Sequence, residues 1–542
     1  MIMNSTVYLS EFAAENDTKK FALAMDHLKA NPYTTLIVEQ GTYHITDERA
    51  REIQRAVMAG EYGRNPEHIL FKPDFEYTRG IYFEGQTGTR VIADGVTLVI
   101  DGFMEPISIR GCENIIIKGF TIRHRRLPYS RGVVTAVTDP TEDTYRLEAL
   151  IEFDEDCPVK EASPMVIKVW PFDPKTKKKT RADHDIWARR YIDSRHITVP
   201  FDNAAEITPG VEFYVGHTAH FRPAVLIENS KDVTLERLTV NNQPGMGILG
   251  NRSENITLRD VNVVPIAGHN FSTNCDATHF SAVKGLLRLE NCTFSGHGDD
   301  MTNVHTYYQK IVSVEGDRVC YMQEKTPDGT HAQTLDYPDV GDILELCSID
   351  SLNLIDTYTV KDVFTMHDEW MCRVELDHAL PENALGLILS NVTRVPKTEI
   401  VGCTATSHNA RSLLIKSRDV LIEDNTFANI AGPAIVVSPE ANWYEGVSSR
   451  DVVIRGNRIT ECAEKWYGDP GAIMVFAGAE HPAGQVLSNI TIEDNVINCP
   501  STPHGITVRN VDGLIVRGNK ITSKDTPIII EDSTSVCCTG NE

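Results

Sequence analysis

The chain has 542 residues, of which 41% are hydrophobic and 24% are charged, a balance typical of globular domains. A net charge of −24 disfavours binding to nucleic acid or anionic lipid and favours a neutral ligand. The sequence lacks an apolar run of about 18 residues, which excludes a membrane-spanning helix, and its first residues show no export signal. We therefore expect a cytoplasmic protein, or a secreted one if a signal was removed.

The first predicted element is an amphipathic helix from Asn16 to Asn31. Asp17 or Thr18 is expected to cap it. We expect this helix to cover the open end of a solenoid. Its apolar stripe consists of Phe21, Ala24, Met25 and Leu28.

A short repeated phrase then runs through most of the chain. Examples are NIIIKGFTI from Asn114, DVTLERLTV from Asp232, NITLRDVNV from Asn255, DVLIEDNTF from Asp419, DVVIRGNRI from Asp451 and NITIEDNVI from Asn489. Each phrase alternates with a period of two and contains a polar turn, and the Asn and Asp at its corners tolerate left-handed backbone. Strands this short become stable only when coils stack on one another. The pattern predicts an all-β protein, a right-handed parallel β-helix.

Two stretches interrupt the repeat, and each reads as a small antiparallel β-barrel or sandwich inserted into the solenoid. The expected organisation is an N-terminal cap with the first coils (1–130), a first insertion (131–220), central coils (221–305), a second insertion (306–395) and C-terminal coils (396–542). The insertions are expected to border the active groove or to support self-association, so a homo-oligomer is left open.

Three acidic residues mark the candidate catalytic site. Asp276 precedes Asp299 by 23 residues and Asp300 by 24, which is one coil of the repeat. Residues one coil apart lie about 4.8 Å from each other along a parallel sheet. Carboxylates this close push one pKa upward, so that one can hold a proton while another stays ionised, as glycoside hydrolysis requires.

Polar and aromatic residues near these carboxylates are candidate sugar-binding groups. Trp443 offers an apolar platform for a sugar ring, although it and Arg411 also fit structural roles. The candidates are His279, Asn303, His305, Asn409, Arg411, Asn442, Trp443 and Glu445.

No cofactor or metal is expected. The chain has neither a P-loop nor a GxSxG motif, and the GxGxxG match at Gly245–Gly250 lies between β-repeats with no helix after it. The twelve cysteines form no CxxC pair and are interpreted as reduced thiols. Five of them lie in or beside short strand-like runs, as small buried residues would: Cys112, Cys292, Cys403, Cys462 and Cys499.

Several of these motifs resemble glycoside hydrolase family 110, α-galactosidases with a parallel β-helix. The similarity runs from about residue 40 to about residue 460. It is carried by GTYHI, MEPISI, GMGILGNRSENITL, DATHF, DDMTNVH, NARSLLIKS and NWYEG. The sequence departs from the family pattern at Met301, Thr302 and Thr306, which leaves the exact sugar open.

The resemblance implies release of terminal α-linked galactose from a carbohydrate substrate, with inversion and without a metal cofactor. Asp276, Asp299 and Asp300 match the acidic positions of the family's site. His279, Asn303, His305, Arg411 and Glu445 match polar positions around it. We expect Asp300 to donate the proton while Asp276 and Asp299 hold the water.

Three other functions are consistent with the residues alone. A glycosidase for another sugar, such as a uronic acid, would need a basic partner for the substrate carboxylate, such as Arg411 or Lys416. A polysaccharide lyase would need an Arg or Lys base. A non-catalytic binding or tailspike-like protein would give the stacked carboxylates no role.

Overall fold

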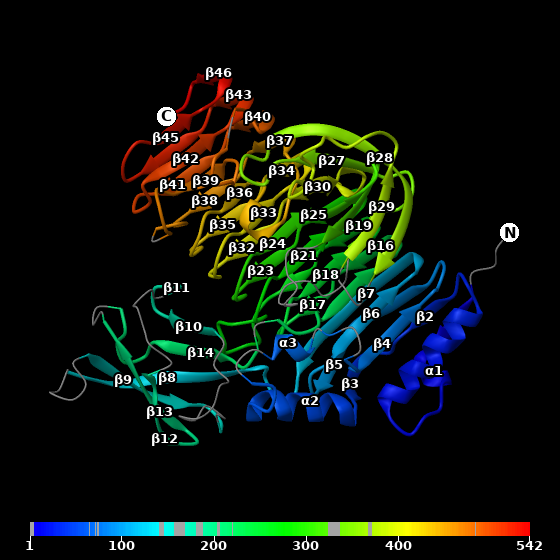
Figure 1. The fold of residues 1–542 in the computed structure, drawn as a ribbon. Helices are drawn as coiled ribbons and strands as arrows, with labels where there is room; N and C mark the ends of the chain where they lie inside the picture. The colour runs from blue at the N-terminus through cyan, green and yellow to red at the C-terminus, as the bar shows by residue number, and fades with distance from the viewer. Residues whose placement is uncertain are drawn as a thin grey trace.

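The computed structural model describes residues 5–63, 66–70, 72, 75–139, 146–156, 168–179, 188–202, 206–218, 220–323, 336–366, 371–464, 466–482 and 484–542 (Figure 1). Most of these residues form an elongated stack of coils, and strands from successive coils pair in parallel. The prediction of a parallel β-helix is therefore confirmed. None of the helices in the described part is both long and apolar enough to cross a membrane.

Each complete coil contributes strands to three parallel ladders, which together enclose the hydrophobic core. The ladder that carries the candidate site, here called the site wall, pairs eleven strands in the described part of the chain. Its strands are β4 (Arg79–Glu84), β6 (Glu105–Arg110), β15 (Val225–Glu228), β18 (Ile248–Asn251), β21 (Thr278–Ser281), β24 (Thr302–His305), β33 (Leu413–Ile415), β36 (Ile435–Val437), β39 (Gly471–Val475), β42 (His504–Arg509) and β45 (Ile528–Glu531).

The other two ladders share the long strands β5 and β7. The second ladder comprises β1 (Thr6–Tyr8), β2 (Thr35–Ile37), β5 (Arg90–Asp101), β7 (Glu113–His124), β16 (Lys231–Glu236), β19 (Glu254–Arg259), β22 (Lys284–Glu290), β31 (Lys397–Val401), β34 (Arg418–Glu423), β37 (Arg450–Arg455), β40 (Leu487–Glu493), β43 (Val511–Arg517) and β46 (Thr534–Thr539). The third adds β3 (Gly41–Thr46), β17 (Thr239–Val240), β20 (Asn262–Val263), β23 (Thr293–Ser295), β32 (Thr404–Thr406), β35 (Thr426–Ala428), β38 (Arg458–Thr460), β41 (Val496–Cys499) and β44 (Lys520–Ser523).

The corners of the coils show why Asn and Asp recur there. Asn114, Asp232, Asn255, Asp451 and Asn489, each the first residue of a repeat phrase, all adopt a positive φ between 54° and 57°. These residue types tolerate the left-handed region better than other non-glycine residues. Inside the C-terminal coils a ladder of asparagines links neighbouring turns by side-chain hydrogen bonds, through the buried Asn425, Asn457, Asn495 and Asn519 and the half-buried Asn541.

Helix α1 (Asp17–Ala30) packs on the N-terminal coils, with the predicted residues Phe21, Ala24, Met25 and Leu28 buried. The predicted cap was wrong by one position. Asn16 has extended backbone, and its side chain accepts the hydrogen bond from the Lys19 amide. The Asp17 carboxylate instead accepts from the His44 amide, at 2.8 Å. Helices α2 (Glu48–Ala59) and α3 (Glu67–Leu70) follow.

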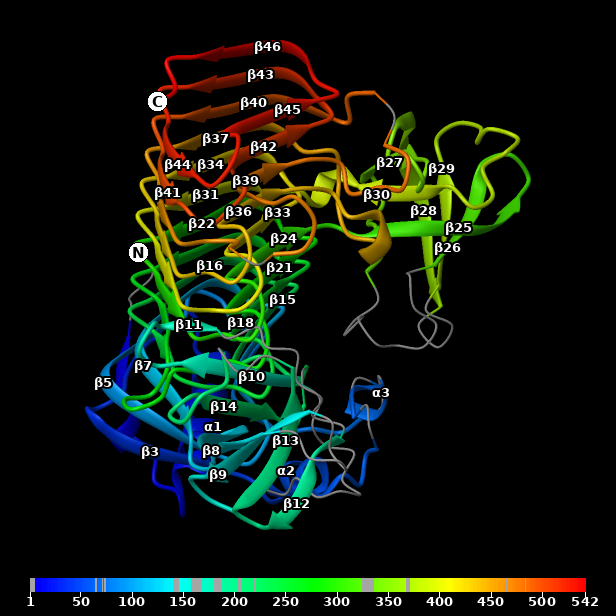
Figure 2. The ribbon, with the colours of Figure 1, turned by 90° about the vertical axis from the view of Figure 1, so that its left-hand side faces the viewer.

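Two antiparallel β-structures interrupt the coils, as the predicted fold class requires (Figure 2). In the described residues the first is a seven-stranded sheet, and the second is a closed six-stranded barrel that projects from the solenoid. The sheet is formed by β8 (Tyr129–Thr138), β9 (Leu147–Phe153), β10 (Lys168–Asp173), β11 (Lys178–Lys179), β12 (Arg190–Asp193), β13 (His196–Phe201) and β14 (Glu212–Gly216). The barrel is formed by β25 (Tyr308–Glu315), β26 (Val319–Gln323), β27 (Ile343–Cys347), β28 (Leu354–Met366), β29 (Met371–Leu376) and β30 (Ile388–Asn391).

Each insertion has its own core and contacts the coils near the candidate site. From the sheet, the Trp170 indole donates to the carbonyl of Gly298 at 3.2 Å, one residue before Asp299. From the barrel, the Ser390 hydroxyl donates to the carbonyl of Gly446 at 2.8 Å. The barrel therefore anchors the loop that carries Glu445.

Candidate active site

Asp276, Asp300 and Arg411 occupy matching positions on three successive coils of the site wall. Each lies two residues before a wall strand, and the strand register pairs Thr278 with Thr302 and Thr302 with Leu413. Adjacent coils are about 4.8 Å apart. The register therefore aligns Asp276 with Asp300 and places Asp299 beside Cys275. Carboxylate oxygens of Asp276 and Asp299 nevertheless lie within 4.8 Å of each other.

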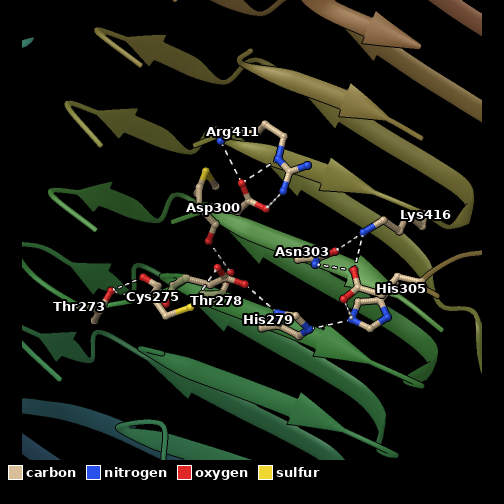
Figure 3. A network of polar contacts seen from close by, with 12 residues as sticks. Thr273, Cys275, Thr278, His279, Asp300, Asn303, His305, Arg411 and Lys416 are labelled. Carbon is tan, nitrogen blue, oxygen red and sulfur yellow. Dashed lines mark hydrogen bonds and ion pairs between the residues drawn. The ribbon is translucent and has the colours of Figure 1, made fainter. Parts of the chain in front are cut away.

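Asp300 is buried against the Arg411 guanidinium (Figure 3). Arg411 donates to Oδ1 from its backbone amide at 2.9 Å and from Nε at 3.0 Å, and to Oδ2 from Nη2 at 2.9 Å. Burial, helped by the charges of Asp299 and Asp276, raises the pKa of Asp300 to about 7 against the opposing effect of Arg411. Such a carboxyl group can hold a proton near neutral pH, as a general acid must.

A second series of polar contacts begins at Asp276 and runs along the site wall. Its Oδ2 lies 2.7 Å from Nδ1 of His279, and Nε2 of His279 lies 2.8 Å from Nε2 of His305. These side chains face outward because the strands alternate, with Phe280 and Val304 pointing into the core.

Glu445 connects these contacts to the buried ammonium group of Lys416. It accepts from Nδ2 of Asn303 at 3.1 Å and from Nζ of Lys416 at 2.7 Å. Lys416 also pairs with Glu440 at 2.9 Å, and Glu440 pairs with Arg411 at 3.0 Å. The predicted residues Asn303, His305, Arg411 and Glu445 therefore lie in one polar network with Asp300 and Asp276.

Three further predicted binding residues are close to members of this network in the sequence. Asn409 lines a small pocket with Trp170, Phe271 and His297, on the side where the inserted sheet meets the coils. Asn442 and Trp443 are exposed at the turn that precedes Glu445. The assignment of all three to sugar binding stays a prediction.

The sequence pointed to Lys416 only as a possible partner of a uronic acid, and it did not point to Glu440. Lys416 had a signal, because it interrupts the apolar run LLIKS at an outward-facing position between buried residues. Glu440 had none, because a tight backbone pairing of Glu440 with Glu445 brings it to the site.

Cys275, Asp276 and Asp299 are close enough together for one ion to touch all three. They provide one thiol and two carboxylates, and Asp276 already contacts His279 through one oxygen. A closed structural zinc site needs four ligands, so this set alone does not make one.

Comparison with known proteins finds relatives that are named alpha-1,3-galactosidase. A family model described as a right handed beta helix region matches residues 385–521. Alpha-1,3-galactosidase A of Bacteroides fragilis is 27% identical over 96% of this chain and 88% of its own length. Alpha-1,3-galactosidase B of Bacteroides thetaiotaomicron is 25% identical over 95% of this chain and 86% of its own.

Solved structures with low sequence identity also align. The catalytic domain of a GH87 alpha-1,3-glucanase in complex with nigerose is 11% identical, with a TM-score of 0.42 over 100% of this chain and 69% of that one. An exopolygalacturonase from Thermotoga maritima is 12% identical, with a TM-score of 0.38 over 100% and 93%. The named relatives confirm the predicted resemblance to glycoside hydrolase family 110. The family model confirms the predicted right-handed β-helix.

Proposed function

We propose that this chain, a relative of proteins named alpha-1,3-galactosidase, is a glycoside hydrolase. Its proposed reaction is the release of terminal α-linked galactose, with the α-1,3 linkage as first choice, from the end of an oligosaccharide and with inversion. The support is the homology over most of the chain together with the buried carboxylates on the site wall.

Arg411 and Lys416 are both paired with carboxylates of the protein, and this observation supports a neutral sugar as the substrate. Arg411 already binds Asp300 and Glu440, and Lys416 already binds Glu440 and Glu445. Neither cation is left to bind a substrate carboxylate, which a uronic acid would require. The surplus of carboxylates also suits the positive charge of an oxocarbenium-like transition state.

In the proposed mechanism Asp300 is the general acid. It gives its proton to the glycosidic oxygen as the bond from that oxygen to the anomeric carbon breaks. Its raised pKa, about 7, supports this role because the group stays largely protonated in slightly acidic solution. Arg411 holds the carboxyl group in place through both oxygens.

Asp276 and Asp299 are proposed to hold the attacking water. A water oxygen forms the new bond to the anomeric carbon, and its proton passes to one of these carboxylates. The short separation of Asp276 and Asp299 suits two acceptors that share one water molecule. Inversion requires the acid and base carboxyl groups to lie roughly 6.5–9.5 Å apart, which is more than the spacing of about 4.8 Å between adjacent coils, so the proposal requires the side chains of Asp276 and Asp300 to diverge.

A matched pair of substrates tests the proposal. 4-Nitrophenyl α-galactoside and 4-nitrophenyl α-galacturonide differ mainly at C6, where the second carries a carboxylate. The purified protein should hydrolyse the galactoside and leave the galacturonide intact, and the D300N variant should hydrolyse neither. Hydrolysis of the galacturonide alone would replace galactose with a uronic acid as the substrate.

A further inference from the structure

Three contacts determine where the protons lie between Asp276 and His305. His279 Nδ1 faces Asp276 Oδ2 at 2.7 Å. On the other side of the ring, His279 Nε2 faces His305 Nε2 at 2.8 Å, as Figure 3 shows. On its other side, His305 Nδ1 lies 3.1 Å from the carbonyl oxygen of Thr306. All three side chains are buried.

The carbonyl oxygen of Thr306 can only accept, so Nδ1 of His305 must carry a hydrogen. A neutral His305 then has a bare Nε2, which accepts, and the hydrogen between the two rings belongs to Nε2 of His279. If Asp276 is ionised it also only accepts, so Nδ1 of His279 must carry a hydrogen too. Both nitrogens of His279 are then protonated.

We infer that His305 fixes His279 as a doubly protonated imidazolium, and that this imidazolium holds the Asp276 carboxylate in place to orient the attacking water. His279 and His305 are thus positioning residues, whereas the sequence suggested that both bind the sugar. The inference about Asp276 and the water rests on the proposed function, but the protonation of His279 does not.

The charged groups around the two rings act in opposite directions on His305. His279 faces Asp276 and His305 directly. Oε1 of Glu445 lies 3.9 Å from Nε2 of His305, and the charge of Glu445 favours protonation of His305, whereas burial and the charge of Lys416 oppose it. The neighbour of His279 on the preceding coil is the uncharged Leu249. Burial opposes protonation of His279, but the hydrogen bond and charge of Asp276, with Glu445, raise its pKa above the ordinary value. Burial lowers the pKa of His305 to about 3, so His305 is neutral and accepts.

This arrangement differs from a dyad in which a neutral histidine acts as the base. There, Nδ1–H points to the aspartate and Nε2 is bare to take a proton. Here Nε2 of His279 is blocked by His305. Removal of a proton from water therefore falls to the carboxylate oxygens.

Two variants of His305 separate positioning from sugar binding. In H305Q the amide oxygen can still accept from His279 Nε2–H, whereas H305L keeps a similar volume and offers no acceptor. Circular dichroism and melting curves establish that each variant folds. The full-length protein is labelled with ¹⁵N-histidine, and H279N identifies the His279 signals.

We expect both ring nitrogens of His279 to be protonated at pH 7.5 in the wild-type protein and in H305Q. In H305L, His279 should lose its second proton at a pH lower by about one unit or more. A neutral His279 in the wild-type protein at pH 7.5, or identical titration in H305L, would overturn the inference. These spectra need no substrate, so they stand if the galactosidase proposal fails.

Kinetics at pH 6 provide the second measurement. H305L should lower kcat on the order of tenfold with little change in KM, because His305 acts through His279 rather than on the sugar. H305Q should recover most of that loss. A rise in KM with kcat unchanged in H305L would instead assign His305 to sugar binding and refute positioning.

Discussion

Replacing Arg411 by lysine tests how the structure sets the protonation of Asp300. The substitution keeps a positive charge and the backbone hydrogen bond to Oδ1, but a lysine ammonium cannot reproduce the paired Nε and Nη2 contacts at 3.0 and 2.9 Å. At least one charge-assisted hydrogen bond to the ionised carboxylate is lost. Because that bond favours the charged form, its loss raises the pKa of Asp300 above about 7.

The size of the shift follows from the strength of such a bond. A hydrogen bond to a charged group contributes about 1.5–3 kcal/mol, and one pKa unit corresponds to about 1.4 kcal/mol. The pKa should therefore rise by roughly one to two units. If Asp300 is the acid, the rate falls as Asp300 loses its proton, so the alkaline limb of kcat/KM should move from near pH 7 to roughly pH 8–9.

The assay is kcat/KM for 4-nitrophenyl α-galactoside between pH 5 and 9.5 in the wild-type and R411K proteins. R418K is the matched control, because Arg418 pairs through two nitrogens with Glu345 at 3.0 and 2.6 Å outside this network. Its profile should coincide with that of the wild type. An alkaline limb that stays in place or moves to lower pH in R411K would refute Asp300 as the acid.

Three further predictions follow from the same structure. D299N and D300N should each lower kcat on the order of 10²–10⁴-fold with unchanged circular dichroism, and wild-type turnover in either would refute the assigned catalytic carboxylates. Burial lowers the pKa of His408 from 6.5 to about 4, so the folded protein holds this histidine neutral. The resulting stability is fully present above pH 6.5, and up to about 3 kcal/mol of the free energy of unfolding is lost as the pH falls toward 4. Melting curves across that range should show a smaller fall in H408Q than in the wild type; an equal fall would contradict this. N457A should lower the melting temperature, because the buried groups that hydrogen-bond to Asn457 are left without a partner, at a cost of about 1–3 kcal/mol of stability each. N498A, at an exposed strand position, should change the melting temperature little.

The repeat made the coils predictable from sequence, because alternation and corner residues are local signals. The first residue of phrases such as those at Asn255 and Asp451 adopts left-handed backbone, as Asn and Asp at a corner suggest. The cap of α1 was missed by one residue, because Asn16, Asp17 and Thr18 are all capping types. In the structure Asp17 accepts from the His44 amide and Thr18 bonds to the backbone of Thr46, which leaves Asn16 as the cap.

The site residues that lie one repeat apart could be predicted from the sequence. The contacts between residues separated by long insertions or turns could not. One coil of spacing placed Asp276 near Asp299 and Asp300, but the spacing alone did not show which of the two is in register with it. Arg411 lies 111 residues after Asp300, beyond the inserted barrel, so its contact with Asp300 depends on how the coils resume. Glu440 reaches the site through a backbone turn that carries no sequence signal.

The most direct test of the account is the anomeric form of the first sugar released. A time course by ¹H NMR with 4-nitrophenyl α-galactoside, and with an oligosaccharide that ends in α-1,3-linked galactose, follows the product before it mutarotates. β-Galactose should appear first, as expected when water held by Asp276 and Asp299 attacks opposite the leaving group protonated by Asp300. Initial release of α-galactose would contradict this division of roles among the three carboxylates.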